Sequence, residues 1–248
     1  MYLIGDIGNT ETKILLFTSK KKIKKRIILK TKLISKLYLS KKFKFLDSKK
    51  REINKILFSS VVPRSYKLIK SYFNKKLKKK CYELKQIKLK NLIKIRVNNK
   101  QIGSDRLANA ISVIDYKNNF IIVDFGTATT FDVVIKNTYL GGVIAPGVSL
   151  SLEKLISKAS LIPKIKLSRI RKVIGKNTST AVKSGFYWGY TGLVNNIISL
   201  IRNETNKNFK IITTGGFSNL FNKAINHKTI NKKDLTINGL LKLANQLK

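Results

Sequence analysis

The chain is short of several residue types, and each shortage excludes a class of protein. Its 248 residues include one cysteine, one histidine, one methionine and three prolines. The lone Cys81 rules out a disulfide framework and a cysteine-rich metal site. No apolar stretch approaches the roughly 20 residues that a transmembrane helix needs, and the first residues carry no signal-peptide pattern. We therefore expect a protein of the cytoplasm with no membrane partner.

Acidic residues are scarce as well. Twelve Asp and Glu against 52 Lys and Arg give a formal net charge of +40, a balance that usually indicates a nucleic-acid partner. However, 44 of the basic residues are lysine and only eight are arginine, whereas base edges and phosphates are read best by arginine's planar fork. We interpret the charge as a solvated lysine surface, typical of drift in an AT-rich coding sequence. We expect no specific nucleic-acid partner, although polyanions should bind nonspecifically at low salt.

Three glycine-containing turns stand out among the lysines. They lie at residues 6–10 (DIGNT), 124–130 (DFGTATT) and 213–218 (TTGGFS), and each follows an apolar run with strand character. Glycine lets the backbone approach an anion closely, while threonine hydroxyls and backbone N–H groups supply donors. The aspartates that lead the first two turns can hold the cation that accompanies a nucleotide phosphate. Three such turns in one chain predict an ATP site between two related halves.

The strand-turn-strand pattern of residues 1–17 is repeated at residues 120–135. Asp6 and Asp124 are 118 positions apart, about half the chain, which predicts two copies of one strand-and-helix unit. We expect an N-terminal domain at 1–117 and a C-terminal domain at 118–248. Further elements are predicted by periodicity and turn signals. They are strands separated by turns within 20–50, a strand at 55–62, and helices at 64–77, 107–114, 149–157, within 180–203, and at 235–247.

Seven motifs in the chain resemble, in the same order, those of the type III pantothenate kinases. They are DIGNTETK at 6–13, SSVVP at 59–63, GSDR at 103–106, VDFGTATTFD at 123–132, GGVIAPG at 141–147, IGKNT at 174–178 and TGG at 214–216. The resemblance implies an α/β fold of the actin-like ATPase superfamily, with two ribonuclease-H-like halves whose mixed sheets are flanked by helices. It also implies a homodimer that uses ATP to phosphorylate pantothenate to 4′-phosphopantothenate, the first step of coenzyme A synthesis. Mg²⁺ or another divalent metal and K⁺ or NH₄⁺ are the implied cofactors.

The catalytic residue that the resemblance implies is Asp105, the base of the GSDR motif. Phosphoryl transfer to an alcohol needs a carboxylate to accept the hydroxyl proton. A helix N-terminus and the neighbouring Arg106 should keep Asp105 ionised near neutral pH. The alternative is that Asp105 only caps the helix that follows it.

The binding residues implied by the resemblance fall into three groups. For ATP they are Asp6, Ile7, Gly8, Asn9, Thr10, Glu11, Thr12, Lys13 and Thr127. For pantothenate they are Gly103, Ser104, Asp105, Arg106 and Thr178, the last supplied across the dimer. For metals they are Asp124, as ligand of the monovalent cation, and Asp6, through the magnesium-bound phosphates. For Lys13, a solvated lysine on a strand is nearly as good an explanation. Gly215 and Gly216 could contact the adenosine or could equally form an ordinary strand-to-helix turn.

Several residues are expected to be structural. Asp132 reads as a turn cap, Trp188 as core or dimer interface, and His227 and Cys81 as residues without a functional partner. Gly185, Gly189 and Gly192 lie three and four apart, which favours close approach by another backbone.

Two alternative functions share the phosphate turns. One is a regulatory or accessory protein of the same fold that binds nucleotide without turning over pantothenate. The other is a kinase for a different small molecule such as a sugar, which has no reason to carry the GSDR motif.

Overall fold

The computed structural model describes residues 1–244, and these form two compact units. The first unit comprises Met1–Ile114 and the segment that begins at Asp234; the second is Asp115–Lys233. This division differs from the predicted domains in two ways. The break falls after residue 114 instead of 117, and the C-terminal helix belongs to the first unit.

The first unit contains a five-stranded sheet in the order β3-β2-β1-β4-β5. β2 is antiparallel to β1 and β3, whereas β4 is parallel to β1 and β5. The strands are β1 (Tyr2–Ile7), β2 (Glu11–Phe17), β3 (Ile23–Lys30), β4 (Lys55–Ser60) and β5 (Cys81–Glu83). The remaining elements are η1 (Thr31–Leu33), α1 (Lys36–Lys42), η2 (Lys44–Glu52), α2 (Pro63–Leu77), η3 (Leu84–Gln86), β6 (Lys94–Ile95), α3 (Ser104–Val113) and α7 (Leu235–Ala244).

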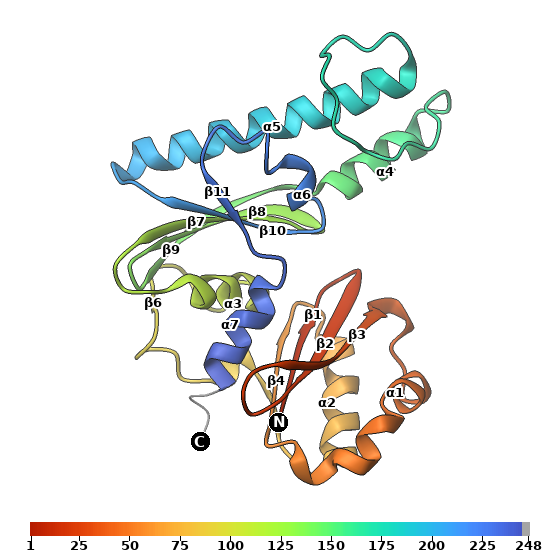
Figure 1. Ribbon diagram of the computed structural model, residues 1–248, viewed down its shortest axis with the longest axis vertical. Coiled ribbons are helices and arrows are strands. Elements are labelled where there is room, and N and C mark those ends of the chain that lie inside the picture. Colours follow the sequence, from red (N-terminus) through yellow and green to blue (C-terminus); the bar gives the residue numbers. More distant parts are fainter. Residues whose placement is uncertain (245–248) are drawn as a thin grey trace. The chain divides into compact units, whose positions relative to one another are not determined.

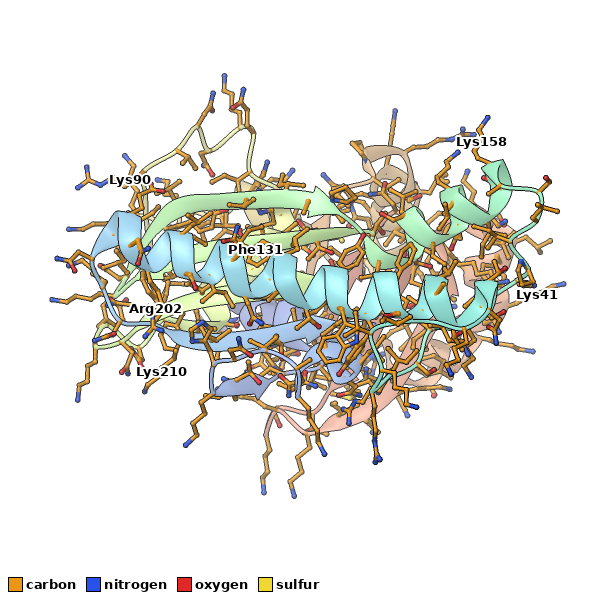
Figure 2. All side chains as sticks on the ribbon, turned by 90° about the horizontal axis from the view of Figure 1, so that it is seen from above. Lys41, Lys90, Phe131, Lys158, Arg202 and Lys210 are labelled. Carbon is orange, nitrogen blue, oxygen red and sulfur yellow. The ribbon has the colours of Figure 1, made fainter. Side chains whose placement is uncertain are left out.

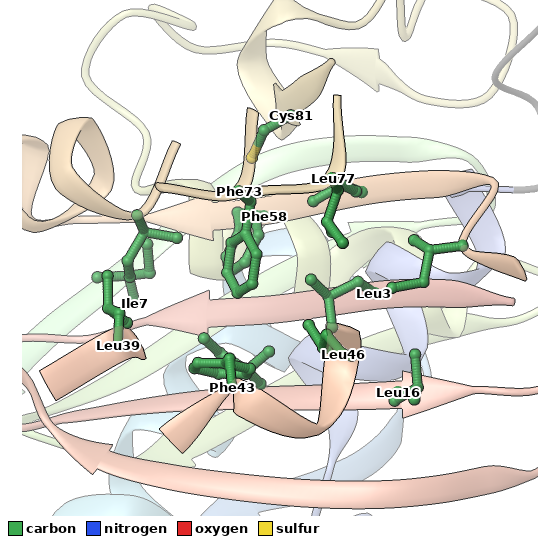
Figure 3. Close-up of a cluster of buried hydrophobic side chains, with 14 of the residues drawn as sticks. Leu3, Ile7, Leu16, Leu39, Phe43, Leu46, Phe58, Phe73, Leu77 and Cys81 are labelled. Carbon is green, nitrogen blue, oxygen red and sulfur yellow. The ribbon is translucent and has the colours of Figure 1, made fainter. Parts of the chain in front are cut away.

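One face of this sheet is covered by α2 and η2. Phe58 of β4 stacks on Phe73 of α2 with ring centroids 6.0 Å apart, and Phe43 meets Phe73 edge-on at 5.0 Å. Leu3 and Ile7 of β1 pack into the same cluster (Figure 3). The other face is covered by α3 and α7, so the strand that carries Asp6 is sandwiched between two helical layers (Figure 1).

The C-terminal helix α7 joins the first unit through specific contacts. Thr236 Oγ donates to Asn109 Oδ1 at 2.9 Å, and Lys242 Nζ donates to the Ile114 carbonyl at 2.6 Å. The Arg26 guanidinium donates two hydrogen bonds, of 2.8 and 2.5 Å, to the carboxylate of Asp234, the residue before α7. The sequence predicted this helix at 235–247; it is confirmed over 235–244, and residues 245–247 lie outside the described residues.

The expectation of several strands within 20–50 was wrong. Only β3 forms there, and η1, α1 and η2 follow it. Ser35 caps α1 by accepting a bond from the Tyr38 N–H at 3.2 Å. Leu39, Phe43 and Leu46, spaced three and four apart, are fully buried. That spacing is the helical period, which the surrounding lysines obscured.

The second unit repeats the arrangement of the first. Five strands of its sheet run in the order β11-β10-β7-β8-β9, with β8 antiparallel to β7 and β9, and β10 parallel to β7 and β11. Its elements are β7 (Asn119–Phe125), β8 (Ala128–Ile135), β9 (Thr138–Pro146), α4 (Val148–Lys158), α5 (Thr178–Thr205), β10 (Lys210–Gly215), α6 (Ser218–Phe221) and β11 (Thr229–Asn231). The long helix α5 lies across this sheet (Figure 1), and its Val194 and Ile198 belong to the same buried cluster as Ile121 and Val123 of β7.

The predicted internal repeat is therefore a repeat of sheet topology. β1, β2, β3, β4 and β5 correspond in order and direction to β7, β8, β9, β10 and β11. The predicted helices at 64–77, 107–114 and 149–157 are confirmed within a few residues as α2, α3 and α4, and the apolar stretch within 180–203 forms α5.

Candidate functional site

The first predicted phosphate turn is the tip of the β1–β2 hairpin. The Gly8 N–H donates to the Glu11 carbonyl at 3.0 Å and closes it. Asp6, one residue before the end of β1, lies between Lys13 of β2 and Ser59 of β4 in the strand register. The fully buried Ser59 donates its hydroxyl to Asp6 Oδ1 at 2.5 Å. A carboxylate that accepts this bond is held in one orientation.

Some of the residues predicted to bind ATP along this hairpin are exposed to solvent and others are buried. Asn9, Thr10 and Glu11 are exposed at the tip. Ile7 and Thr12 are fully buried, and Thr12 Oγ lies 2.9 Å from Thr31 Oγ. The side chains of Ile7 and Thr12 thus face the core, so any contribution from them to nucleotide binding comes through the backbone or through the shape of the turn. For Gly8 and Lys13, both half-buried, the role stays a prediction.

The GSDR motif begins helix α3, with Gly103 at the N-cap. The carboxylate of Asp105 curls back over Gly103, since a Cβ at position 103 would stand 2.4 Å from Asp105 Oδ1. The same oxygen accepts a bond from the Arg106 N–H at 2.8 Å. Only glycine at position 103 leaves room for this arrangement.

The electrostatic setting of Asp105 differs from the expected one. Burial raises the pKa of Asp105, and this effect outweighs the Arg106 N–H, the Arg106 charge and the charge of Lys85, all of which lower the pKa. The predicted stabilisation of the ionised form is present but is not the largest influence. A carboxylate with a raised pKa is a stronger proton acceptor, which is the property that a general base needs.

Glu83 is a residue that sequence reasoning missed. Ser104 is buried and donates its hydroxyl to Glu83 Oε1 at 2.5 Å. Glu83 Oε2 accepts from the Lys85 N–H at 2.7 Å. The Ser104 hydroxyl therefore holds the first turn of α3 in place instead of facing solvent. The scarcity of acids in the chain was the available signal, because Glu83 is one of only twelve.

Within the first unit, the segment after β4 links the first turn to the GSDR motif. The Val61 N–H donates to the Ile7 carbonyl at 3.1 Å. A methyl carbon of Val61 would lie 3.6 Å from a Cβ on Gly103. The structure thus brings three predicted motifs together: the turn led by Asp6, the Ser59 segment and the start of α3.

The second predicted turn occupies the equivalent place in the second unit and is one residue shorter than the first. The Gly126 N–H donates to the Ala128 carbonyl at 3.1 Å and closes the β7–β8 hairpin. Asp124 lies between Thr130 of β8 and Thr214 of β10 in the register. Gly215 has a φ of +88°, and a Cβ there would stand 2.6 Å from both Asp124 Oδ1 and the Phe125 carbonyl oxygen.

The chemistry of those two oxygens can be compared with what the predicted monovalent-cation site needs. A carboxylate oxygen and a backbone carbonyl oxygen on the same side of a residue without a side chain are the hard donors that alkali cations take. Asp124 and its surroundings therefore fit such a cation. Among residues 1–244, no cluster of three or more His, Cys, Asp or Glu side chains has the arrangement of a metal site, so a divalent ion would depend on the nucleotide phosphates for most of its ligands.

The loop that carries Thr127 is supported by a glycine that the site prediction did not include. A Cβ at Gly147, the N-cap of α4, would come within 1.9 Å of the Thr127 carbonyl oxygen. The signal was present in the sequence, since Gly147 ends the GGVIAPG motif.

Thr178 is exposed at the first residue of α5. The turn before it is capped by Asn177, whose Oδ1 accepts from the Thr180 N–H at 2.9 Å. Thr178 belongs to the second unit and the GSDR motif to the first, so the compact units do not group this residue with the other predicted pantothenate contacts.

The residues expected to be structural have mixed outcomes. Asp132 is fully buried and accepts from the Tyr139 hydroxyl at 2.7 Å, a structural role in the middle of β8 instead of in a turn. Trp188 is exposed at 37% and is not part of the core. Cys81 is buried, and burial raises the pKa of its thiol to about 12, which keeps it protonated and unreactive near neutral pH.

The glycines of α5 do not meet another backbone within the described chain. A Cβ at Gly185, Gly189 or Gly192 would have no atom within 4 Å. Gly185 and Gly189 instead line an open groove of about 390 Å³ between α4 and α5, together with apolar side chains such as Leu155 and Phe186.

No helix among the described residues is both long enough and apolar enough to cross a bilayer. Basic residues come from all parts of the sequence, and Lys41, Lys90, Lys158 and Lys210, labelled in Figure 2, are examples.

Two α/β units with the same strand order, each with an aspartate before a glycine hairpin, define the fold class of this chain. Solved structures agree. A ROK family glucokinase from Streptomyces griseus, solved with glucose and AMPPNP, superposes with a TM-score of 0.54 at 10% identity, covering 99% of this chain and 100% of that one. An inorganic polyphosphate/ATP-glucomannokinase from Arthrobacter sp. strain KM has a TM-score of 0.51 at 13% identity, covering 99% of both chains. At these identities the likeness shows the fold.

Sequence comparison identifies the family. The family model of the type III pantothenate kinases matches residues 2–200. A type III pantothenate kinase from Pelagibacter ubique (strain HTCC1062) is 58% identical over 248 residues, which cover 100% of both chains. The chain belongs to the type III pantothenate kinase family, and it is a kinase.

Proposed function

We propose that the protein transfers the γ-phosphoryl group of ATP to the 4′-hydroxyl of pantothenate, the opening step of coenzyme A synthesis. Membership of the family supports the reaction. The single structural observation that carries it is Asp105: a carboxylate with a raised pKa, on a helix N-terminus, in the same unit as the turn led by Asp6. An accessory protein that only binds nucleotide has no need of such a proton acceptor.

In this mechanism the hydroxyl oxygen of pantothenate forms a bond to the γ-phosphorus while the bond from that phosphorus to the β,γ-bridging oxygen breaks. The hydroxyl proton goes to Asp105 and ADP leaves. Arg106, next to Asp105 on α3, supplies positive charge and a planar fork for a carboxylate or phosphate. Phosphoryl transfer depends mainly on alignment and charge compensation, which the fixed start of α3 supports.

The two phosphate turns hold the nucleotide in this proposal. The exposed residues Asn9, Thr10 and Glu11 form the first, with Asp6 facing the magnesium-bound phosphates. Thr127 belongs to the second, and Asp124 would hold K⁺ or NH₄⁺ beside Gly215. A bound monovalent cation adds positive charge near the phosphates.

We also propose that the protein acts as a homodimer in which Thr178 of one subunit contributes to the pantothenate site of the other. The groove between α4 and α5 supports this, because its lining is mostly apolar and Trp188 of the same helix α5 is 37% exposed. A second copy would bring a backbone to Gly185 and Gly189, as their spacing predicts.

The test is a coupled assay for ADP release with four arms: with and without pantothenate, each in potassium and in sodium buffer. We expect ADP to form only with pantothenate, and faster in potassium. ADP release that ignores pantothenate would contradict the kinase assignment and favour the accessory protein. Equal rates in the two buffers would remove the cation role of Asp124 but leave the reaction intact.

A further inference from the structure

Thr31, which lies outside every predicted motif, bonds to the back of the first phosphate turn. It is the first residue after β3 and is 4% exposed. Its hydroxyl donates to the Gly8 carbonyl at 2.7 Å, and its N–H donates to the Thr10 carbonyl at 3.0 Å. Two carbonyl oxygens of one turn are thus bound by a single residue that is more than 20 positions away.

The direction of the third bond follows from counting protons. A threonine hydroxyl has one hydrogen, and that of Thr31 is used on Gly8. The 2.9 Å contact between Thr31 Oγ and Thr12 Oγ therefore has Thr12 as donor. The result is a chain of bonds from the Thr12 hydroxyl to the Thr31 hydroxyl to the Gly8 carbonyl, and both threonines are buried. Hydrogen bonds in such a chain reinforce one another.

This chain matters for a turn that is to bind phosphate. Phosphate oxygens are bound by N–H donors and repelled by carbonyl oxygens. Because Thr31 engages the carbonyls of Gly8 and Thr10, these oxygens are directed away from a bound phosphate. The buried side chain of Thr12, which has no direct route to the nucleotide, gains a role in the same arrangement.

We propose that Thr31 is a positioning residue for nucleotide binding: it holds the Gly8 and Thr10 carbonyls back so that the first turn offers donors to the ATP phosphates. The proposal rests on the proposed function, since it assigns how that turn binds ATP. Thr31 touches no reacting atom and acts only through the turn.

The test compares Thr31→Val, which keeps the shape but removes the hydroxyl, with Thr31→Ser, which keeps the hydroxyl. Thr31→Val leaves the half-buried Gly8 carbonyl and the buried Thr12 hydroxyl without the Thr31 hydroxyl as a partner, so we expect the KM for ATP to rise about tenfold. The KM for pantothenate should stay within about twofold, and Thr31→Ser should restore most of the ATP affinity. Equal increases in both KM values, or no rescue by serine, would mean that Thr31 only stabilises the fold.

A matched control is Thr191→Val in α5. Thr191 is 6% exposed, and its hydroxyl donates to the Tyr187 carbonyl at 2.7 Å, so the substitution removes a bond of the same length from an equally buried site. We expect its KM for ATP to be that of the wild type. If Thr31→Val does not fold, Thr12→Val decides: it removes only the outer donor, and a KM for ATP at the wild-type value would overturn the proposal. Failure of the proposed function is distinguishable, because the wild-type protein itself would then not phosphorylate pantothenate.

Discussion

The first and second phosphate turns occupy equivalent places in the two sheets but are supported in different ways. In the first unit Glu11 pairs with Lys30 at the end of β3, and in the second Ala128 pairs with Pro146 at the end of β9. The next residue in each unit, Thr31 or Gly147, is therefore at the equivalent position.

Those two residues hold their turns by different forces. Thr31 donates two hydrogen bonds to turn carbonyls, whereas Gly147 packs its backbone against the Thr127 carbonyl. One architecture thus allows either hydrogen bonding or close packing at the same place. The first turn should be sensitive to loss of a hydroxyl, and the second to the gain of a single methyl group.

The units differ most in what is added to the common frame. The first carries α3 with Asp105, and the second carries the long helix α5. If the comparison is right, the two units share phosphate binding, but proton transfer belongs to the first unit alone.

The largest expected effect therefore comes from Asp105→Asn. Removal of a general base costs about 10²–10⁴-fold in rate, so we expect kcat to fall by that factor while ATP still binds. Steady-state kinetics with a direct nucleotide-binding measurement checks this. Near-normal turnover would rule out Asp105 as the base and leave it with a structural role at the start of α3.

Stability provides the control for this variant. Because burial raises the folded-state pKa of Asp105, its contribution to stability is present at acid pH and is lost as the pH rises through that pKa. At neutral pH an uncharged asparagine should not destabilise the fold. We expect the melting temperature of Asp105→Asn to equal or exceed that of the wild type, and a clear drop would indicate a structural role.

The next effect tests the close packing in the second unit. In Gly147→Ala the new methyl would meet the Thr127 carbonyl oxygen at 1.9 Å, whereas in Gly8→Ala it would meet the Glu11 carbonyl at 3.1 Å. We expect Gly147→Ala to lower the free energy of unfolding by about 1–3 kcal/mol, and Gly8→Ala to change it by less than about 1 kcal/mol. Chemical denaturation measures both, and equal losses would contradict the proposed difference between the turns.

The smallest expected effect is a shift of the pH profile. The rate of the wild-type enzyme should fall as the pH drops through the raised pKa of Asp105, because the base must be deprotonated. The charge of Lys85 lowers that pKa, so Lys85→Gln should move the acid limb of the profile to higher pH. Lys85 is exposed, and the shift should shrink at high salt.

Lys88→Gln is the matched control for the pH experiment. Lys88 is an exposed lysine three residues further along the chain, and it is not among the charges that influence Asp105. Its pH profile should coincide with that of the wild type. A displaced limb in both variants would indicate a general effect of net charge instead of a local one.

Much of the architecture could be predicted from the chain because it is written in local patterns. Apolar runs ended by glycine turns marked β1 and β7, and helical spacing marked α2, α3 and α4. Where the pattern was diluted, the prediction was wrong: the apolar residues Leu39, Phe43 and Leu46 form a helical core stripe hidden among lysines. The order of the motifs along the chain was enough to find the site. The residues that hold those motifs in place were not predicted. Thr31, Glu83 and Gly147 act through contacts that no spacing rule predicts.

The amino-acid order alone determined the doubled strand-and-turn pattern and the family, because backbone propensities and glycine positions act over a few residues at a time. Tertiary structure decided which side chains face a ligand and which face the core. Thr12 is buried against Thr31, Ser104 is bonded to Glu83, and α7 packs in the first unit. These outcomes depend on contacts between segments far apart in the chain, where burial and hydrogen-bond partners are set only once the sheets and helices have packed.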